Sequence, residues 1–224
     1  MIKYKVVTDK PIAYDSLDHI IPEGTSRDNN SNQGYIDEVL EYFENRPIKY
    51  MDLGCSGGQL IVDLLKRGSD AIGLEGSDYS IVHQRANWPE YHNKNLFTCD
   101  IAHPFQITDE NDERVLFDCI SAWEVLEHIP ADNLKVLMQN IHDHLAPGGI
   151  FIGSVSLDPH PQWHVSIFPK HIWERSIFAP LFITTPYIFK NKVRQDVDHC
   201  SFFVILKKAP HESEIDMGAP GEQI

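Results

Sequence analysis

Three acidic residues each end a strand-like segment of the sequence, and carboxylates in such places can bind polar ligands. They are Asp52, Glu75 and Asp100. A carboxylate only accepts hydrogen bonds, so Glu75 can accept from both hydroxyls of a ribose, and Asp100 from an exocyclic amine such as that of adenine. These residues therefore predict a ligand that carries adenine and ribose.

A glycine-rich turn, residues 54–58, follows the first of these acids. Glycine lets the backbone turn sharply and come close to a ligand. A dinucleotide site needs G-x-G-x-x-G, which brings a helix N-terminus to the pyrophosphate. Counted from Gly54, Gly58 stands at the fourth place and Gln59 at the fifth, so the third glycine of that pattern is missing. The turn favours an adenosyl ligand without phosphate, and S-adenosylmethionine has that chemistry.

A second group of polar residues, Glu124, Glu127 and His128, follows the next strand-like segment, where an acceptor would meet the ligand. Glu127 is expected to fix the turn through hydrogen bonds to backbone. His128 either does the same or serves as a general base near neutral pH. Trp123 either lies near adenine or fills the core.

A cluster rich in histidine lies further along, comprising Asp158, His160, Trp163, His164 and His171. It is either a polar surface loop or an acceptor pocket in which His164 or His160 removes a proton from a hydroxyl. His and Asp also suit Mg, Mn or Zn sites. No tight ligand spacing supports a metal, so no metal site is expected, and Asp196, Asp198 and His199 decide nothing.

The elements that must position these residues alternate along the chain, which predicts a parallel sheet covered on both faces. The predicted strands are 48–53, 70–75, 95–100, 115–123, 149–156 and 200–208, and the predicted helices 34–45, 58–68, 77–88, 130–145 and about 169–178. Residues 1–34 are polar and predict a loop or lid. One domain, 1–208, is expected, with a lid and helix (1–46), a cofactor-binding core (48–156) and an acceptor-side part (157–208), followed by a disordered tail (209–224).

The composition of the chain indicates which classes of partner and which cellular location to expect. The net charge of −14 would repel a nucleic-acid backbone, so no nucleic acid is expected. The four cysteines form no C-x-x-C pair, which indicates reduced thiols in a cytoplasmic protein. No segment is apolar enough for a signal peptide or a membrane helix.

Five segments resemble, in order and spacing, the motifs of class I S-adenosylmethionine-dependent methyltransferases. They are "YMDLGCSGG", "AIGLEGSDYS", "LFTCDI", "FDCISAWEVLEHIP" and "HLAPGGIFIGS". Ser56 stands where the family's middle glycine usually stands. The resemblance implies a Rossmann-like α/β fold with a doubly wound, seven-stranded, mostly parallel sheet whose last strand, 200–208, is antiparallel. It also implies a cofactor site made by Asp52, Gly54, Cys55, Ser56, Gly58, Glu75, Gly76, Ser77, Asp100, Ile101, Trp123 and Glu124.

The flanks "DHIIPEGTSRDNNSN" and "HPQWHVSIFPKHIW" resemble methyltransferases found among sugar, polysaccharide and secondary-metabolite enzymes. The expected reaction is O-methylation of a small molecule or a sugar or glycan hydroxyl, with His128 or His164 as the base, in a monomer or homodimer. Two alternatives stay open. One is a non-catalytic adenosyl-binding protein of the same fold; the other is an NAD-dependent oxidoreductase, against which the missing glycine argues.

Overall fold

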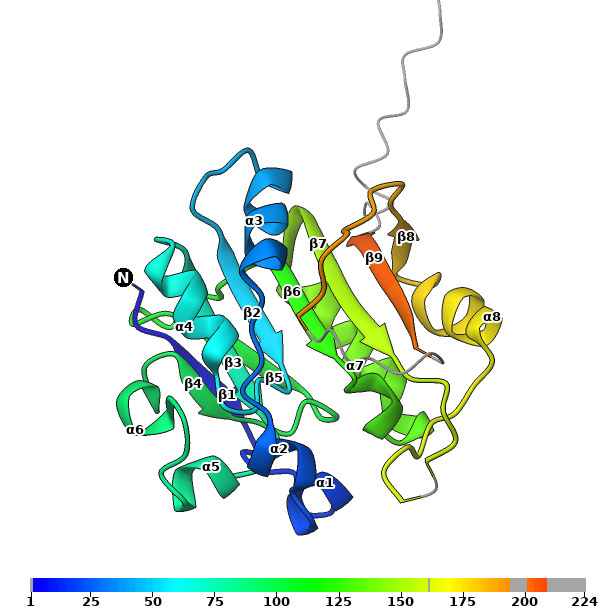
Figure 1. Cartoon of the computed structure of the whole chain (residues 1–224), viewed down its shortest axis with the longest axis horizontal. Coiled ribbons are helices and arrows are strands. Elements are labelled where there is room, and N and C mark those ends of the chain that lie inside the picture. Colours follow the sequence, from blue (N-terminus) through cyan, green and yellow to red (C-terminus); the bar gives the residue numbers. More distant parts are fainter. Residues whose placement is uncertain (1, 161, 194–200, 209–224) are drawn as a thin grey trace, which may run out of the picture.

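A seven-stranded sheet forms the centre of the molecule, with the strand order β4-β3-β2-β6-β7-β9-β8 (Figure 1). The computed structural model describes residues 2–160, 162–193 and 201–208. The strands of this sheet are β2 (Lys49–Leu53), β3 (Asp70–Glu75), β4 (Leu96–Thr98), β6 (Phe117–Trp123), β7 (Leu145–Val155), β8 (Phe182–Thr184) and β9 (Phe202–Lys208). Neighbours from β4 to β7 pair in parallel, and β9 is antiparallel to β7. The predicted fold class is confirmed.

Helices cover both faces of the sheet because its strands are apolar on both sides. On one face α3 (Gln33–Tyr42) and α4 (Gln59–Lys66) pack against Tyr50 of β2. On the other face α7 (Ala131–His144) and the π-helix η2 (Trp173–Phe178) share a core with Met51 of the same strand. Within the described ranges, no helix is long and apolar enough to cross a membrane.

The strand order changes direction between β2 and β6, since β3 and β4 lie on one side of β2 while β7 lies beyond β6. In open α/β sheets the carboxyl ends of the strands flank a crevice at such a point, and ligands bind there. The ends of β2 and β6 carry Asp52, Trp123 and the residues that follow. The topology therefore places Asp52 and Trp123 at neighbouring strand ends, at the point of the sheet where a ligand is expected.

The N-terminal region is more regular than predicted. Within residues 1–34 the structure has β1 (Lys5–Thr8), α1 (Leu17–Ile20) and α2 (Glu23–Arg27). Strand β1 pairs antiparallel with β5 (Phe105–Thr108), which lies between the predicted strands 95–100 and 115–123, where no element was predicted. These elements are four or five residues long, too short to show a hydrophobic period.

The predicted helix 77–88 is also wrong in part. It is replaced by two single turns, α5 (Tyr79–Val82) and α6 (Trp88–Tyr91). Between them Gln84 and Ala86 have φ values of 48° and 49°, which no α-helix accepts. The break lets the buried Trp88 donate its indole N–H to the carbonyl of Ser56 at 2.6 Å. The predicted helix at about 169–178 is confirmed, because α8 (Lys170–Ile172) continues directly into the π-helix η2 without a break.

A buried histidine gives the fold a pH-dependent stability. His144 accepts the backbone N–H of Ile107 at Nε2 (3.1 Å) and donates from Nδ1 to the carbonyl of Asn140 (2.7 Å), so only its neutral form fits. Burial lowers the pKa of His144 below its ordinary value. The unfolded chain therefore binds more protons below about pH 6.5, and the contribution of His144 to stability is lost as pH falls from there.

We expect the free energy of unfolding to fall more between pH 7.5 and pH 5.5 for the natural chain than for His144→Gln. Glutamine removes the titrating group. Urea unfolding at each pH gives the free energy of unfolding, and the difference between the two proteins in its pH dependence isolates His144 from other groups. An equal pH dependence in both proteins would show that His144 does not contribute.

Candidate functional site

The first predicted acid, Asp52, lies on β2 and bonds to β6, the two strands between which the strand order changes direction. It pairs in register with Ser121 of β6, whose hydroxyl donates to its carboxylate at 2.5 Å. Burial raises the pKa of Asp52 to about 7; the Ser121 hydrogen bond opposes this rise and the charge of Glu75 adds to it. Two carboxylates thus lie close enough to influence each other, as a site built from strand ends requires.

The glycine turn adopts left-handed backbone at three positions, with φ of 74° at Gly54, 47° at Ser56 and 82° at Gly58. Such a φ is uncommon for serine. The Ser56 hydroxyl donates to the carbonyl of Asp28 at 2.6 Å, and its backbone N–H donates to Glu75 at 2.8 Å. These bonds hold Ser56 in a left-handed backbone conformation that glycine would adopt freely. The neighbouring Cys55 is buried.

Glu75 accepts three hydrogen bonds from the protein itself. They come from the backbone N–H groups of Ser56 (2.8 Å) and Ser77 (3.3 Å) and from the hydroxyl of Thr25 (3.3 Å). Burial raises the pKa of Glu75, and the two backbone N–H groups oppose this rise. Since a carboxylate offers about four acceptor sites, these three bonds leave about one site open on Glu75, and its contact with ribose stays a prediction.

Residues 13–29, the N-terminal cover, pack on these strand ends. The backbone N–H of Ala13 donates to the carbonyl of Gly76 at 2.9 Å, and Asn29 accepts the N–H of Gln59 at 3.0 Å. Figure 1 shows α1 and α2 beyond the arrowhead of β2. This placement fits the predicted lid. Thr25 and Asn29 both lie in the flank "DHIIPEGTSRDNNSN", whose resemblance to other methyltransferases assigned neither of them a role at the site.

The third acid behaves differently. Asp100 accepts the backbone N–H of Ala102 at 3.0 Å and lies 2.9 Å from Nδ1 of His103, so its carboxylate caps the turn after β4. Ile101 is buried in the core. The structure thus gives Asp100 a structural role, and its contact with adenine stays a prediction.

Trp123 packs away from the strands that would flank adenine. Its ring meets Tyr35 edge-on at 5.1 Å and lies 6.3 Å from Phe203 of β9. These contacts favour the core alternative over a place near adenine, which would lie by β3 and β4. Its buried indole N–H has no partner among the described residues.

A second set of functional groups meets after β6. One potential ligand atom each from Glu127, His128 and His164 lies within 4.8 Å of the others. Two of them belong to the 3-10 turn η1 (Leu126–His128), and the backbone carbonyl of Glu127 accepts the N–H of Val165, next to the third. The prediction that set a metal aside relied on ligand spacing in the sequence, whereas folding brings these donors together.

Glu127 is fully buried, and only half of its carboxylate is satisfied. Oε1 accepts the backbone N–H of Ser156 at 3.1 Å, as predicted for a residue that fixes the turn, while Oε2 has no partner among the described residues. Burial raises the pKa of Glu127 to about 7; Glu124 adds to the rise and His128 opposes it. Glu124 likewise has one buried oxygen, Oε1, without a described partner, while Oε2 accepts the hydroxyl of Ser201.

Both predicted catalytic histidines have one ring nitrogen occupied. Nδ1 of His128 lies 3.1 and 3.0 Å from the two carboxylate oxygens of Asp18, a residue of the N-terminal cover that the sequence did not reveal. Nδ1 of His164 lies 2.6 Å from the carbonyl of Asp158. The rings are 5.0 Å apart. Burial lowers the pKa of His128, but the hydrogen bond and charge of Asp18 outweigh this and raise it.

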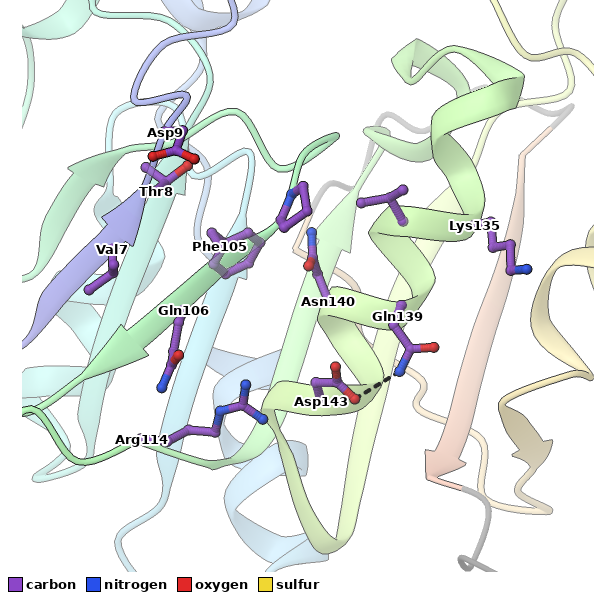
Figure 2. A pocket seen from close by; sticks show the side chains of 12 residues that line it. Val7, Thr8, Asp9, Phe105, Gln106, Arg114, Lys135, Gln139, Asn140 and Asp143 are labelled. Atoms are coloured by element: carbon purple, nitrogen blue, oxygen red, sulfur yellow. Dashed lines mark hydrogen bonds between the residues drawn. The ribbon is translucent and has the colours of Figure 1, made fainter.

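The other histidines of this region stand apart. The ring of His160 lies 5.8 Å from that of His164 and packs edge-on against Trp163, while His171 is exposed on α8. A separate hollow lies between the β1–β5 ribbon and α7, where Phe105, Asn140 and Asp143 are among its lining residues (Figure 2). None of the predicted site residues lines that hollow. The predicted chemistry therefore lies at the strand ends and not in this hollow.

Comparisons with known proteins identify the family of the chain. Residues 27–204 match a family model described as a methyltransferase domain. The chain is 33% identical over 101 residues to a ubiquinone biosynthesis O-methyltransferase of Aliivibrio fischeri, covering 45% of this chain and 41% of that protein. It is 29% identical over 145 residues to the mitochondrial ubiquinone biosynthesis O-methyltransferase of Rattus norvegicus, covering 58% of this chain and 40% of that protein. The matches thus span about two fifths of these relatives.

Among solved structures, the chain is similar to the N-methyltransferase NodS of Bradyrhizobium japonicum in complex with S-adenosylhomocysteine. The TM-score is 0.56 at 14% identity, covering 88% of this chain and 99% of NodS. At that identity the likeness concerns the fold.

Proposed function

The chain belongs to the class I S-adenosylmethionine-dependent methyltransferases, and from that premise we propose that it methylates a hydroxyl oxygen of a small-molecule acceptor. The observation that carries the proposal is the pair His128 and His164, which meets at the end of β6, beside the strand ends that bear Asp52 and Glu75. The ubiquinone biosynthesis relatives, which are O-methyltransferases by name, support oxygen as the acceptor atom.

S-adenosylmethionine supplies a methyl group activated by a sulfonium, whose leaving group is a neutral thioether. What remains for the protein is mainly positioning. We assign Glu75 to the ribose hydroxyls and Asp52, with the turn from Gly54 to Gly58, to the rest of the adenosyl ligand. Gly76 and Ser77 lie beside Glu75 and belong to the same proposed site.

The acceptor end of the site is built by the imidazoles. Because Nδ1 of His128 and of His164 is engaged, Nε2 is the free nitrogen of each ring. A hydroxyl placed against these nitrogens is oriented by them, and its proton has a nearby acceptor. The chain's reduced thiols fit the predicted cytoplasmic location: Cys55, Cys99 and Cys119 are buried and free.

The test is product analysis with S-adenosylmethionine and a panel of catechols, phenols and sugars. We expect release of S-adenosylhomocysteine and an O-methylated product with a phenolic hydroxyl, and less or none with sugars. His128→Ala should lower kcat by about 100-fold or more, the usual weight of a group that assists proton transfer, with unchanged affinity for S-adenosylhomocysteine.

One other outcome would change the expected acceptor, and two would contradict the proposal. Methylation of sugars in preference to phenols would favour a sugar or glycan hydroxyl as the acceptor. Binding of S-adenosylhomocysteine without any product would favour a non-catalytic binding protein. Tight binding of NAD in its place would favour the oxidoreductase.

A further inference from the structure

The cluster of Glu127, His128 and His164 has the donor set of a metal centre. Each residue offers a ligand atom within 4.8 Å of the other two. Two donors that lie about 2.1 Å from one ion are at most about 4.2 Å apart, so small side-chain movements close the site around an ion. Two imidazoles and one carboxylate, with positions left open, suit divalent first-row transition metals.

The histidines are already held as metal ligands usually are. A ligating histidine donates its other ring N–H to a carboxylate or a backbone carbonyl, which fixes the tautomer and turns the lone pair toward the ion. His128 has the carboxylate of Asp18 at Nδ1, and His164 has the carbonyl of Asp158. A carbonyl only accepts hydrogen bonds, so Nδ1 of His164 carries the proton and Nε2 the lone pair.

Glu127 supplies an independent reason for a cation. Its side chain is fully buried, and Oε2 has no partner among the described residues. A buried carboxylate oxygen without a partner costs free energy, and a bound cation removes that cost. Oε1 of Glu124, three positions earlier in the sequence, is a second buried oxygen without a described partner, and its charge acts on Glu127. Glu124 is therefore a candidate for a fourth ligand.

We propose that Glu127, His128 and His164 bind one divalent first-row metal ion, and that this ion holds the acceptor oxygen during methyl transfer. The second half rests on the proposed O-methylation. A bound cation lowers the pKa of a hydroxyl that it coordinates and orients the oxygen, and the hydroxyl's proton passes to solvent. The imidazoles then act as ligands, which replaces the general-base role predicted for them.

The test uses tag-free full-length protein, stripped with a chelator and titrated with Co²⁺ by visible absorption and with Zn²⁺ by calorimetry. We expect one ion per chain and a Co²⁺ spectrum typical of nitrogen ligands. His164→Ala and Glu127→Gln should weaken binding by about 100-fold or more, and Asp18→Asn by about 10-fold or more, since it removes the partner of a ligand. His160→Ala is the matched control and should bind as the natural chain does, because its ring is near His164 but outside the cluster.

Absence of stoichiometric binding, or an equal loss in His160→Ala and His164→Ala, would overturn the site. Titration with S-adenosylhomocysteine shows that the variants are folded, because the metal ligands do not belong to the cofactor acids. Full methyl transfer by the stripped enzyme would overturn the role of the ion while leaving the site. Normal binding of both ion and S-adenosylhomocysteine, with no product from any acceptor, would instead overturn the proposed function and confirm the metal site.

Discussion

Replacing Glu75 with alanine is expected to raise the Kd for S-adenosylhomocysteine by about 100-fold or more. A hydrogen bond to a charged group contributes about 1.5–3 kcal/mol, and the proposed ribose contact uses two such bonds. In the variant, hydrogen bonds from the ribose hydroxyls to water partly replace both of them. A loss of about 3 kcal/mol corresponds to a little over 100-fold in Kd. Calorimetric titration of the purified chain measures it directly.

Two variants separate the ribose contact from the packing of the turn. Glu75 also accepts the N–H groups of Ser56 and Ser77, so its loss loosens the turn as well. Glu75→Gln keeps the shape and one acceptor oxygen, and should give an intermediate affinity. Thr25→Ala removes the hydrogen bond from a side-chain hydroxyl to Glu75 but leaves the carboxylate. The affinity of this variant for S-adenosylhomocysteine should therefore stay within about 3-fold of that of the natural chain. Unchanged binding by Glu75→Ala would remove the ribose assignment.

The central sheet was predictable because each of its parallel strands is an apolar run that ends at a turn signal. The strand predicted at 70–75 has those bounds in the structure, as β3. The acids follow from the same logic, since the carboxyl ends of parallel strands meet at one edge. Local signals also fixed α7, where Pro130 precedes the first helical residue, Ala131.

What the sequence could not show depends on contacts between distant segments. Residues 77–88 have a helical pattern, but burying Trp88 against the turn at Ser56 stabilises a broken path instead. Asp18 lies in the flank "DHIIPEGTSRDNNSN", whose resemblance assigned it no role, and only folding brings it to His128. For the same reason the sequence did not indicate a metal site, because Glu127 and His164 are far apart in the chain and only folding brings them together. An aspartate at a strand end, such as Asp100, can bind a ligand or cap a turn, and the sequence is the same in both cases.

Replacing Gly54 with alanine is expected to destabilise the chain by about 2–5 kcal/mol and to abolish measurable binding of S-adenosylhomocysteine. Gly54 has a φ of +74°, and an added Cβ would lie 2.5 Å from Cγ2 of Val125. The left-handed backbone costs a non-glycine residue about 1–2 kcal/mol, and overpacking costs about 1–3 kcal/mol more. The methyl group also enters the turn that follows Asp52, so the strand end and the loop after β6 cannot both keep their places. Urea unfolding and calorimetry measure the two effects.

Gly148→Ala is the control that separates backbone strain from the clash. Gly148 has nearly the same φ, +75°, but an added Cβ meets nothing within 4 Å. We expect it to cost only the strain of about 1–2 kcal/mol and to leave cofactor binding unchanged. The double variant Gly54→Ala/Val125→Ala should lose less free energy of unfolding than the two single variants lose in sum, because shortening Val125 removes the collision. Strictly additive effects would show that Val125 is not what makes glycine necessary at this turn, and the close packing of the loop after β6 against the glycine turn would then carry no energetic weight.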